Sequence, residues 1–187
     1  LLKLCAGLLT PTSGQITICG TPVGPDTKGL VSYLPDRTYL NNRQKVCAQL
    51  DYFQDFYPDF DRARAERMLQ SLHIDPNSTF GTLSKGNREK VQLVLVMSRR
   101  AKLYLLDEPI AGVDPAARDY VISTIINNYN PEATVIISTH LIADIEQVLD
   151  EVIFLKEGNI VLQKTVDEIR SEHAMSVDEL FREAFKW

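Results

Sequence analysis

The most constraining feature of the sequence is a short apolar run that ends in two adjacent carboxylates. Residues 103–106 read Leu-Tyr-Leu-Leu, and Asp107, Glu108 and Pro109 follow directly. A continuous apolar run of this length predicts a strand that is buried on both faces, as in a parallel sheet. Pro109 lacks the N–H group that a central strand needs, so the strand is expected to end before it.

The position of the two carboxylates indicates a functional role. Ligands of open α/β sheets bind at the carboxyl ends of the strands, which is where Asp107 and Glu108 are expected. Side chains alternate along a strand, so these two point in different directions and can have different roles. On their own, two such residues fit a solvated turn or a helix cap equally well. The neighbouring motifs decide between these interpretations.

Other segments predict alternating strands and helices. Runs of strand-forming residues bounded by Gly or Pro predict strands at residues 15–20, 30–34 and 134–138, the last one buried, and a hairpin over 152–162. Apolar residues at helical spacing predict helices that begin near residues 45, 61, 84, 115, 141 and 177. Residues 43–100 are therefore expected to form a helical subdomain inserted into one α/β domain over residues 1–187.

Composition excludes some function classes. The net charge is −5 and no polybasic tract is present, so no nucleic-acid partner is expected. The three cysteines have no CxxC spacing and are expected to be reduced thiols of a cytoplasmic protein. No apolar run is as long as a membrane span, so any membrane role is expected to depend on a partner.

Four motifs follow one another in a fixed order. They are Leu83-Ser84-Lys85-Gly86-Asn87, the run from Leu103 to Pro109, Gly112-Val113-Asp114-Pro115 and Ser138-Thr139-His140. In this order they resemble the signature motif, Walker B motif, D-loop and switch histidine of the ATP-binding cassette (ABC) ATPases, the nucleotide-binding subunits of ABC transporters. The resemblance covers nearly the whole chain. It implies a P-loop NTPase-like α/β fold, a mostly parallel sheet flanked by helices, with an inserted helical subdomain.

The resemblance assigns roles at the strand end. It implies that Asp107 holds Mg²⁺ through water, since this cation prefers oxygen ligands and keeps several of its waters. It implies that Glu108 is the general base that polarises the attacking water. It also implies that His140 bonds the γ-phosphate of ATP and keeps the water in register with Glu108. A lone histidine after a strand is otherwise an ordinary surface or core residue.

The signature region is expected to bind nucleotide from the start of a helix. Free N–H groups and the helix dipole form an anion site there, and the Ser84 hydroxyl and the open backbone at Gly86 suit a phosphate. The resemblance implies that this phosphate belongs to ATP on the other subunit, where Asp114 also acts. Lys85 and Asn87 depart from the usual LSGGQ; Lys85 is either solvated or adds charge near the γ-phosphate. A plain helix cap is the alternative.

Asp36 stands where the family has the glutamine of its Q-loop. Its carboxylate can reach Mg²⁺ or the waters of Mg²⁺, although it brings negative charge close to phosphate. A metal-related role for Asp36 is expected, against the alternative of an ordinary loop acid. The nearby residues Tyr33-Leu34-Pro35 complete this loop.

The family's P-loop, GxxGxGK[ST], does not occur in this sequence. The P-loop cradles phosphates through its backbone N–H groups and lysine. Residues 1–4 resemble those that directly follow it, so we expect the chain to be an N-terminally incomplete cassette that is inactive by itself.

The resemblance implies the ATP-binding, ATP-hydrolysing subunit of a bacterial ABC transporter, of the drug, antibiotic or lipid exporter type. Its expected partners are a transmembrane permease and a second ATP-binding subunit, with which it sandwiches ATP and Mg²⁺. It is expected in the cytoplasm, on the inner face of the membrane. A soluble cassette of the DNA-repair or translation type is a second possibility, but it predicts coiled-coil insertions or two cassettes. A degenerate cassette with a regulatory or structural role is the third.

Overall fold

The structure of the chain is a computed structural model that describes residues 1–186. The chain divides into two compact units, Leu1–Thr139 and His140–Trp187. Each unit has its own hydrophobic cluster, as expected for segments that fold around separate cores.

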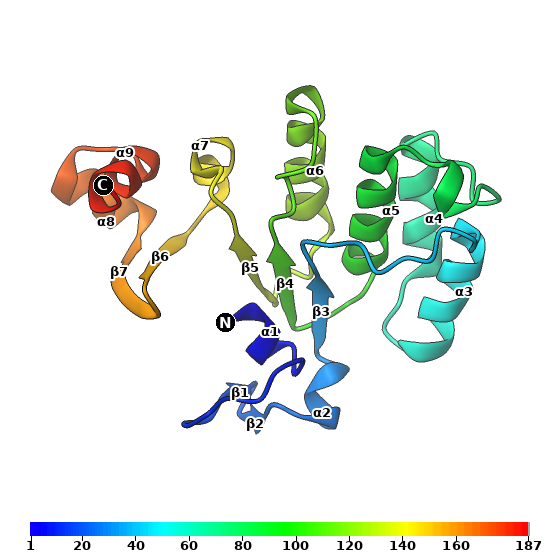
Figure 1. Cartoon of the computed structure of the whole chain (residues 1–187), viewed down its shortest axis with the longest axis horizontal. Coiled ribbons are helices and arrows are strands. Elements are labelled where there is room, and N and C mark those ends of the chain that lie inside the picture. The colour runs from blue at the N-terminus through cyan, green and yellow to red at the C-terminus, as the bar shows by residue number, and fades with distance from the viewer. Residues whose placement is uncertain (187) are drawn as a thin grey trace. The chain divides into compact units, whose positions relative to one another are not determined.

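The centre of the first unit is a parallel sheet of three strands in the order β3-β4-β5 (Figure 1). The strands are β3 (Val31–Leu34), β4 (Leu103–Asp107) and β5 (Thr134–Ser138). Leu34 pairs with Leu106, and Asp107 pairs with Ser138, so the carboxyl ends of the three strands lie at one edge. This confirms the predicted α/β fold with a parallel sheet and helices around it.

Burial differs between β4 and β5. The four apolar residues 103–106 of β4 are all buried, and the strand ends at Asp107, as the sequence predicts. A strand is present at residues 134–138, as predicted, but the prediction that this strand is buried is wrong. β5 is exposed or half-buried along its length, and Ile136 is 36% exposed. In the described sheet β5 pairs with β4 alone, so it lies at an edge, where an apolar strand is less covered.

A group of helices connects β3 to β4 and lies beyond β3, away from β5 (Figure 1). These helices are α3 (Val46–Phe56), α4 (Arg62–Ser71), the 3-10 turn η1 (Phe80–Thr82) and α5 (Lys85–Met97). Asp61 caps α4 by accepting a hydrogen bond from the N–H of Arg64, at 2.9 Å. The second half of α5, residues 91–97, is buried. Ser32 of β3 donates to the Val96 carbonyl at 2.9 Å, which ties α5 to the sheet.

The remaining elements of the first unit are short apart from one helix. They are α1 (Leu2–Cys5), β1 (Thr17–Ile18), β2 (Thr21–Pro22), α2 (Pro25–Lys28) and α6 (Pro115–Asn128). Leu2 and Ile18 pack with Leu103 and Leu105, so the N-terminal segment covers one face of β4. α6 begins at Pro115 because proline suits the first turn of a helix.

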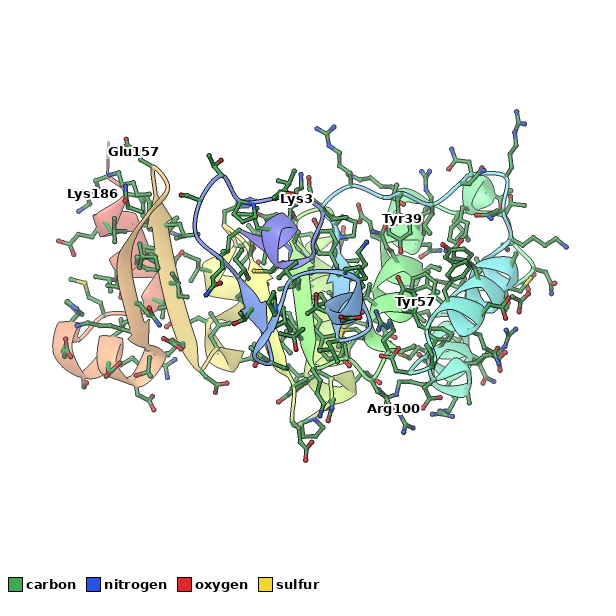
Figure 2. The ribbon with its side chains drawn as sticks, turned by 90° about the horizontal axis from the view of Figure 1, so that it is seen from below. Lys3, Tyr39, Tyr57, Arg100, Glu157 and Lys186 are labelled. Atoms are coloured by element: carbon green, nitrogen blue, oxygen red, sulfur yellow. The ribbon has the colours of Figure 1, made fainter. Side chains whose placement is uncertain are left out.

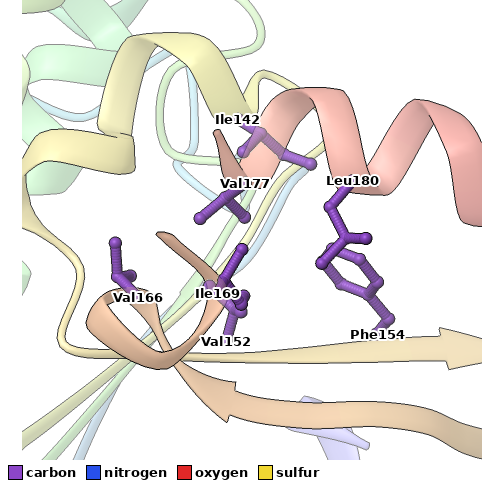
Figure 3. Packing of buried hydrophobic residues seen from close by; sticks show 7 residues of the cluster. All are labelled: Ile142, Val152, Phe154, Val166, Ile169, Val177 and Leu180. Atoms are coloured by element: carbon purple, nitrogen blue, oxygen red, sulfur yellow. The ribbon is translucent and has the colours of Figure 1, made fainter. Parts of the chain in front are cut away.

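The second unit is an antiparallel hairpin with helices. It contains α7 (Ile142–Ile145), η2 (Glu146–Val148), β6 (Glu151–Lys156), β7 (Asn159–Thr165), α8 (Val166–His173) and α9 (Val177–Ala184). Figure 3 shows its core, where Phe154 of β6 packs with Ile169 of α8 and Leu180 of α9. The hairpin and α9 were predicted. Sequence reasoning missed α8, whose signal is the capping box between Thr165 and Glu168.

Arg99 connects the helical segment to the amino end of the sheet. Its guanidinium pairs with both carboxylate oxygens of Asp59, at 3.1 Å each, and lies 3.9 Å from the centre of the Tyr57 ring. It also donates to the carbonyls of Gly29 and Val31, at 2.7 Å each. The sequence did not predict this network, because a distant partner such as Asp59 leaves no local pattern.

Candidate functional site

Three side chains from neighbouring strands meet at the carboxyl end of the sheet. Asp107 is half-buried at the end of β4. Ser138 of β5 donates its Oγ proton to Asp107 Oδ1 at 2.6 Å, a short distance typical of a hydroxyl bonded to a carboxylate. The Tyr33 hydroxyl of β3 donates to Asp107 Oδ2 at 3.5 Å. The in-register parallel pairing thus orients the Asp107 carboxylate from both sides.

The environment of Tyr33 reflects the acidic character of this edge. Burial raises the pKa of the Tyr33 hydroxyl, and the Asp107 carboxylate raises it further, with a smaller contribution from Asp36. The phenol is therefore held in its neutral form, in which it donates a proton to Asp107. Tyr33 and Ser138 belong to motifs found in the sequence, but the sequence predicted no role at the site for either residue. Their signal is that each lies at the end of a predicted strand beside the Asp107 strand.

Glu108 follows Asp107 in an unusual backbone conformation. Its φ is +51°, in the left-handed region that residues other than glycine seldom adopt. The Glu108 N–H donates to the Ser138 carbonyl at 2.9 Å, which continues the pairing between β4 and β5 by one residue. The chain then turns into the loop that leads to α6. Left-handed residues of this kind are costly, and they concentrate at functional sites.

The predicted nucleotide-binding residues of the signature motif lie at the start of α5. Ser84 caps the helix, because its Oγ accepts a hydrogen bond from the N–H of Asn87 at 3.2 Å. Lys85 is exposed, and its Nζ lies 3.8 Å from Oε1 of Glu89. The Ser84 cap was predicted as one of two interpretations, and it is compatible with the other, phosphate binding.

Gly86 has no packing reason to be glycine. Apart from its chain neighbours and the backbone of its own helix, no atom of the described residues lies within 4 Å of a Cβ built on Gly86, and its φ is not positive. Glycine inside a helix is less favourable than alanine by about 1 kcal/mol. The space beside Gly86 is therefore open.

The other predicted residues lie around these two regions. Asp114 is exposed in the loop before α6, where its carbonyl accepts from the N–H of Ala117 at 2.8 Å. Asp36 is exposed two residues after the end of β3. His140 begins the second unit, two residues after the end of β5.

The donors at the sheet edge fit a magnesium ion bound with a nucleotide. Mg²⁺ prefers oxygen ligands, and in nucleotide sites it uses one or two carboxylates together with phosphates and water. Asp107 offers such a carboxylate, already oriented by Ser138 and Tyr33. Over residues 1–186, no cluster of three or more His, Cys, Asp or Glu side chains suited to a metal is found.

The fold and the geometry of the site define the class of this chain. It is an α/β protein with an acidic site at the carboxyl end of a parallel sheet. The sequence profile described as "ABC transporter" matches residues 1–111. The chain belongs to this family, among its ATP-binding proteins.

Known relatives support this assignment. The chain is 28% identical to the uncharacterized ABC transporter ATP-binding protein YhaQ of Bacillus subtilis, over 90% of the chain and 58% of the relative. It is 25% identical to the SkfA peptide export ATP-binding protein SkfE of the same organism, over 91% of the chain and 74% of the relative. The chain spans 50% of one similar cyanobacterial protein, the Synechocystis ABC transporter ATP-binding protein sll0415, and 58% of YhaQ.

A solved structure of the ATP-binding subunit of an ABC transporter has the same fold. It superposes with a TM-score of 0.85 at 28% identity, over 99% of this chain and 82% of that one. A putative ABC transporter ATP-binding protein from Pyrococcus furiosus superposes with a TM-score of 0.64 at 26% identity, over 74% of this chain and 70% of that one. Among the described residues, no helix is long and apolar enough to cross a membrane.

Proposed function

We propose that this chain is the ATP-binding and ATP-hydrolysing part of an ABC transporter subunit of the exporter type. The observation that carries the proposal is the carboxyl end of β4, where Ser138 and Tyr33 orient Asp107 and Glu108 follows in a left-handed conformation. Membership of the ABC transporter family supports ATP as the ligand. The similarity to SkfE, a peptide export ATP-binding protein, supports the exporter type.

Asp107 and Glu108 have separate roles in this proposal. Asp107 would hold Mg²⁺, and this ion would supply positive charge that neutralises the phosphates. Glu108 accepts a proton from the attacking water as a general base, a role that typically contributes about 10²–10⁴-fold to the rate. His140 bonds the γ-phosphate and keeps the attacking water aligned with Glu108. Asp36 takes part at the metal through its waters, in place of the family's glutamine.

The start of α5 completes the site of a second subunit. Ser84, Gly86 and Asn87 present N–H groups and a hydroxyl to the γ-phosphate of the partner's ATP, and Lys85 adds a positive charge there. The open space beside Gly86 supports this contact. Asp114 acts across the same interface. Two subunits thus close on two ATP molecules, and closure and reopening drive a transmembrane permease, which holds the subunit at the inner face of the membrane.

Residues 1–187 alone are proposed to bind Mg-ATP weakly and not to hydrolyse it. The GxxGxGK[ST] sequence that supplies the main phosphate cradle is not among them. Calorimetric titration with Mg-ATP tests this directly, on these residues and on a form extended upstream through a P-loop sequence, here called the P-loop-extended subunit. Tight stoichiometric binding by residues 1–187 would contradict this part of the proposal.

The hydrolytic role is tested by the steady-state ATPase rate of the P-loop-extended subunit with Glu108→Gln. We expect kcat to fall by about 10²–10⁴-fold while Mg-ATP still binds, because glutamine keeps the shape and loses the base. Glu157→Gln is the matched control, since Glu157 also has a positive φ, of 49°, but lies exposed in the hairpin turn. An unchanged rate in Glu108→Gln would contradict the role of Glu108 as the base. No ATPase activity in the P-loop-extended wild type would favour the degenerate cassette.

A further inference from the structure

One side chain joins the start of α5 to the loop that follows Glu108. The carboxylate of Glu89, on α5, lies against the backbone of Gly112. A Cβ added at Gly112 would lie 2.4 Å from Glu89 Oε1 and 2.9 Å from Oε2. Such distances are too short for any real Cβ, so the contact is possible only because residue 112 is glycine.

Stability does not explain the position of Glu89. Its Oε2 is buried, and within residues 1–186 no donor lies within hydrogen-bond distance of it. A buried acceptor without a donor is unfavourable for folding. Lys85 is the cation beside Glu89, at 3.8 Å from Oε1, but Lys85 is 77% exposed and an exposed pair contributes little.

The contact connects the two regions that the proposed function uses at different ATP molecules. Ser84 and Gly86 lie at the start of the helix that carries Glu89, and they face the partner's ATP in the proposed function. The loop of Gly112 begins at Glu108, the base for the subunit's own ATP, and ends at Asp114. A shift of α5 on binding the partner's phosphate would therefore reach this loop through the Glu89 carboxylate.

We propose that Glu89 is a positioning residue that, through Gly112, couples the start of α5 to the loop between Glu108 and Asp114. The proposal rests on the proposed function and adds communication between the two ATP sites. Glu89 does not touch the reacting atoms. Its effect is to hold the loop in the arrangement that places Glu108.

The test is a pair of substitutions and their combination in the P-loop-extended subunit. Glu89→Ala removes the carboxylate. Gly112→Ala displaces the carboxylate, because the added Cβ would lie too close to it. The backbone of Gly112 has no positive φ and therefore accepts alanine. Each single variant is expected to lower kcat by about tenfold with KM unchanged. This magnitude is typical of the coupling between residues that are in contact. The double variant is expected to be no worse than either single one. Effects that multiply in the double variant would overturn the proposal.

Hydrogen exchange separates positioning from a merely structural role. Glu89→Ala is expected to speed exchange of the amides in residues 110–114 while the melting temperature stays unchanged. Glu89→Gln keeps the shape and the contact, and it is expected to retain both slow exchange and activity. Glu66→Ala is the control, since Glu66 also pairs with a residue four positions away, Arg62, at 2.8 Å, but lies on α4.

The exchange experiment distinguishes the two proposals. If no variant hydrolyses ATP, the proposed function fails, yet exchange in residues 110–114 still reports whether Glu89 orders the loop. If Glu89→Ala lowers the melting temperature, or leaves exchange of this loop unchanged, the positioning role of Glu89 is wrong.

Discussion

The two ends of the three-stranded sheet are built in opposite ways. At the amino end, Arg99 is buried and its guanidinium is satisfied by Asp59, two backbone carbonyls and the ring of Tyr57. At the carboxyl end, the consecutive residues Asp107 and Glu108 both carry carboxylates, and Glu108 has a φ of +51°. The amino end is arranged for stability. The carboxyl end carries carboxylates and a residue in the left-handed backbone region, and such residues concentrate at functional sites.

This difference follows from chain direction. In a parallel sheet every strand ends at the same edge, so the loops after the strands gather there, and ligands of such sheets bind at that edge. The loops entering the strands gather at the other edge and are free to be filled with structural contacts. Substitutions at the amino end should therefore change stability, and those at the carboxyl end should change nucleotide binding and hydrolysis.

The largest effect on stability is expected from Arg99→Leu. Removing one partner of a buried charged network typically costs about 3–5 kcal/mol, and here it leaves the Asp59 carboxylate and two carbonyls without their donor. Urea unfolding measures the loss. Arg100→Leu is the control, because Arg100 is 68% exposed and pairs with Asp61 at 3.3 Å. Figure 2 shows Arg100 at the surface. Equal losses in the two variants would contradict the assigned role of Arg99.

A smaller effect is expected from Ser138→Ala at the other end. It removes the hydrogen bond to Asp107 Oδ1, at a cost of about 1.5 kcal/mol for a bond to a half-buried charged group. The Mg²⁺ concentration needed for half-maximal ATPase activity should rise, since Asp107 is then less well oriented. Ser123→Ala, which removes an exposed bond of 2.9 Å to the Tyr120 carbonyl, should change neither quantity. An unchanged Mg²⁺ requirement in Ser138→Ala would argue against Asp107 as the metal ligand.

A pair of glycine substitutions also tests the difference between the functional and the structural regions. Gly86 and Gly29 both have open space where a Cβ would lie, and neither has a positive φ. Alanine at such positions raises the free energy of unfolding by about 0.5 kcal/mol, because it reduces the conformational entropy of the unfolded chain. Thermal unfolding should show this small gain for both variants, but only Gly86→Ala should lose ATPase activity. Loss of activity in Gly29→Ala, or none in Gly86→Ala, would break the distinction between the two ends.

The smallest effect is expected from Tyr33→Phe. The bond to Asp107 is long, at 3.5 Å, so little stability is lost at neutral pH. Because the pKa of Tyr33 is raised by folding, the unfolded chain loses this proton first as the pH rises above the ordinary tyrosine pKa of 10.0. The wild type should therefore lose stability above that pH more steeply than Tyr33→Phe, as followed by urea unfolding. Parallel curves would contradict the burial of this hydroxyl beside Asp107.

The parts of the fold that sequence reasoning found are those with a local signal. The apolar run of β4, the start of α4 near residue 61 and the hairpin over residues 152–162 each depend on a few adjacent residues. The Arg99 network was missed because it joins residues 29, 31, 57, 59 and 99, which no local pattern connects.

At the candidate site the limit is similar. The motifs predicted roles for Asp107 and Glu108, whereas the hydrogen bonds of Tyr33 and Ser138 to Asp107 become visible only once the strands are paired. Burial of β5 was overestimated because an apolar run does not reveal whether a strand lies at a sheet edge. Glu89 was missed since its contact with Gly112 depends on how the loop packs on α5.

The most direct test of the central claim is to locate bound metal nucleotide by NMR. Mn²⁺ in place of Mg²⁺ broadens nearby amide signals steeply with distance, and weak binding of Mn-ATP is sufficient. The two ends of β4, Leu103 and Asp107, are about 13 Å apart at about 3.3 Å per residue. We predict that broadening is strongest at Asp107, Glu108 and Ser138 and much weaker at Val31 and Leu103. Strongest broadening at the amino end, or uniform broadening along β4, would contradict the account.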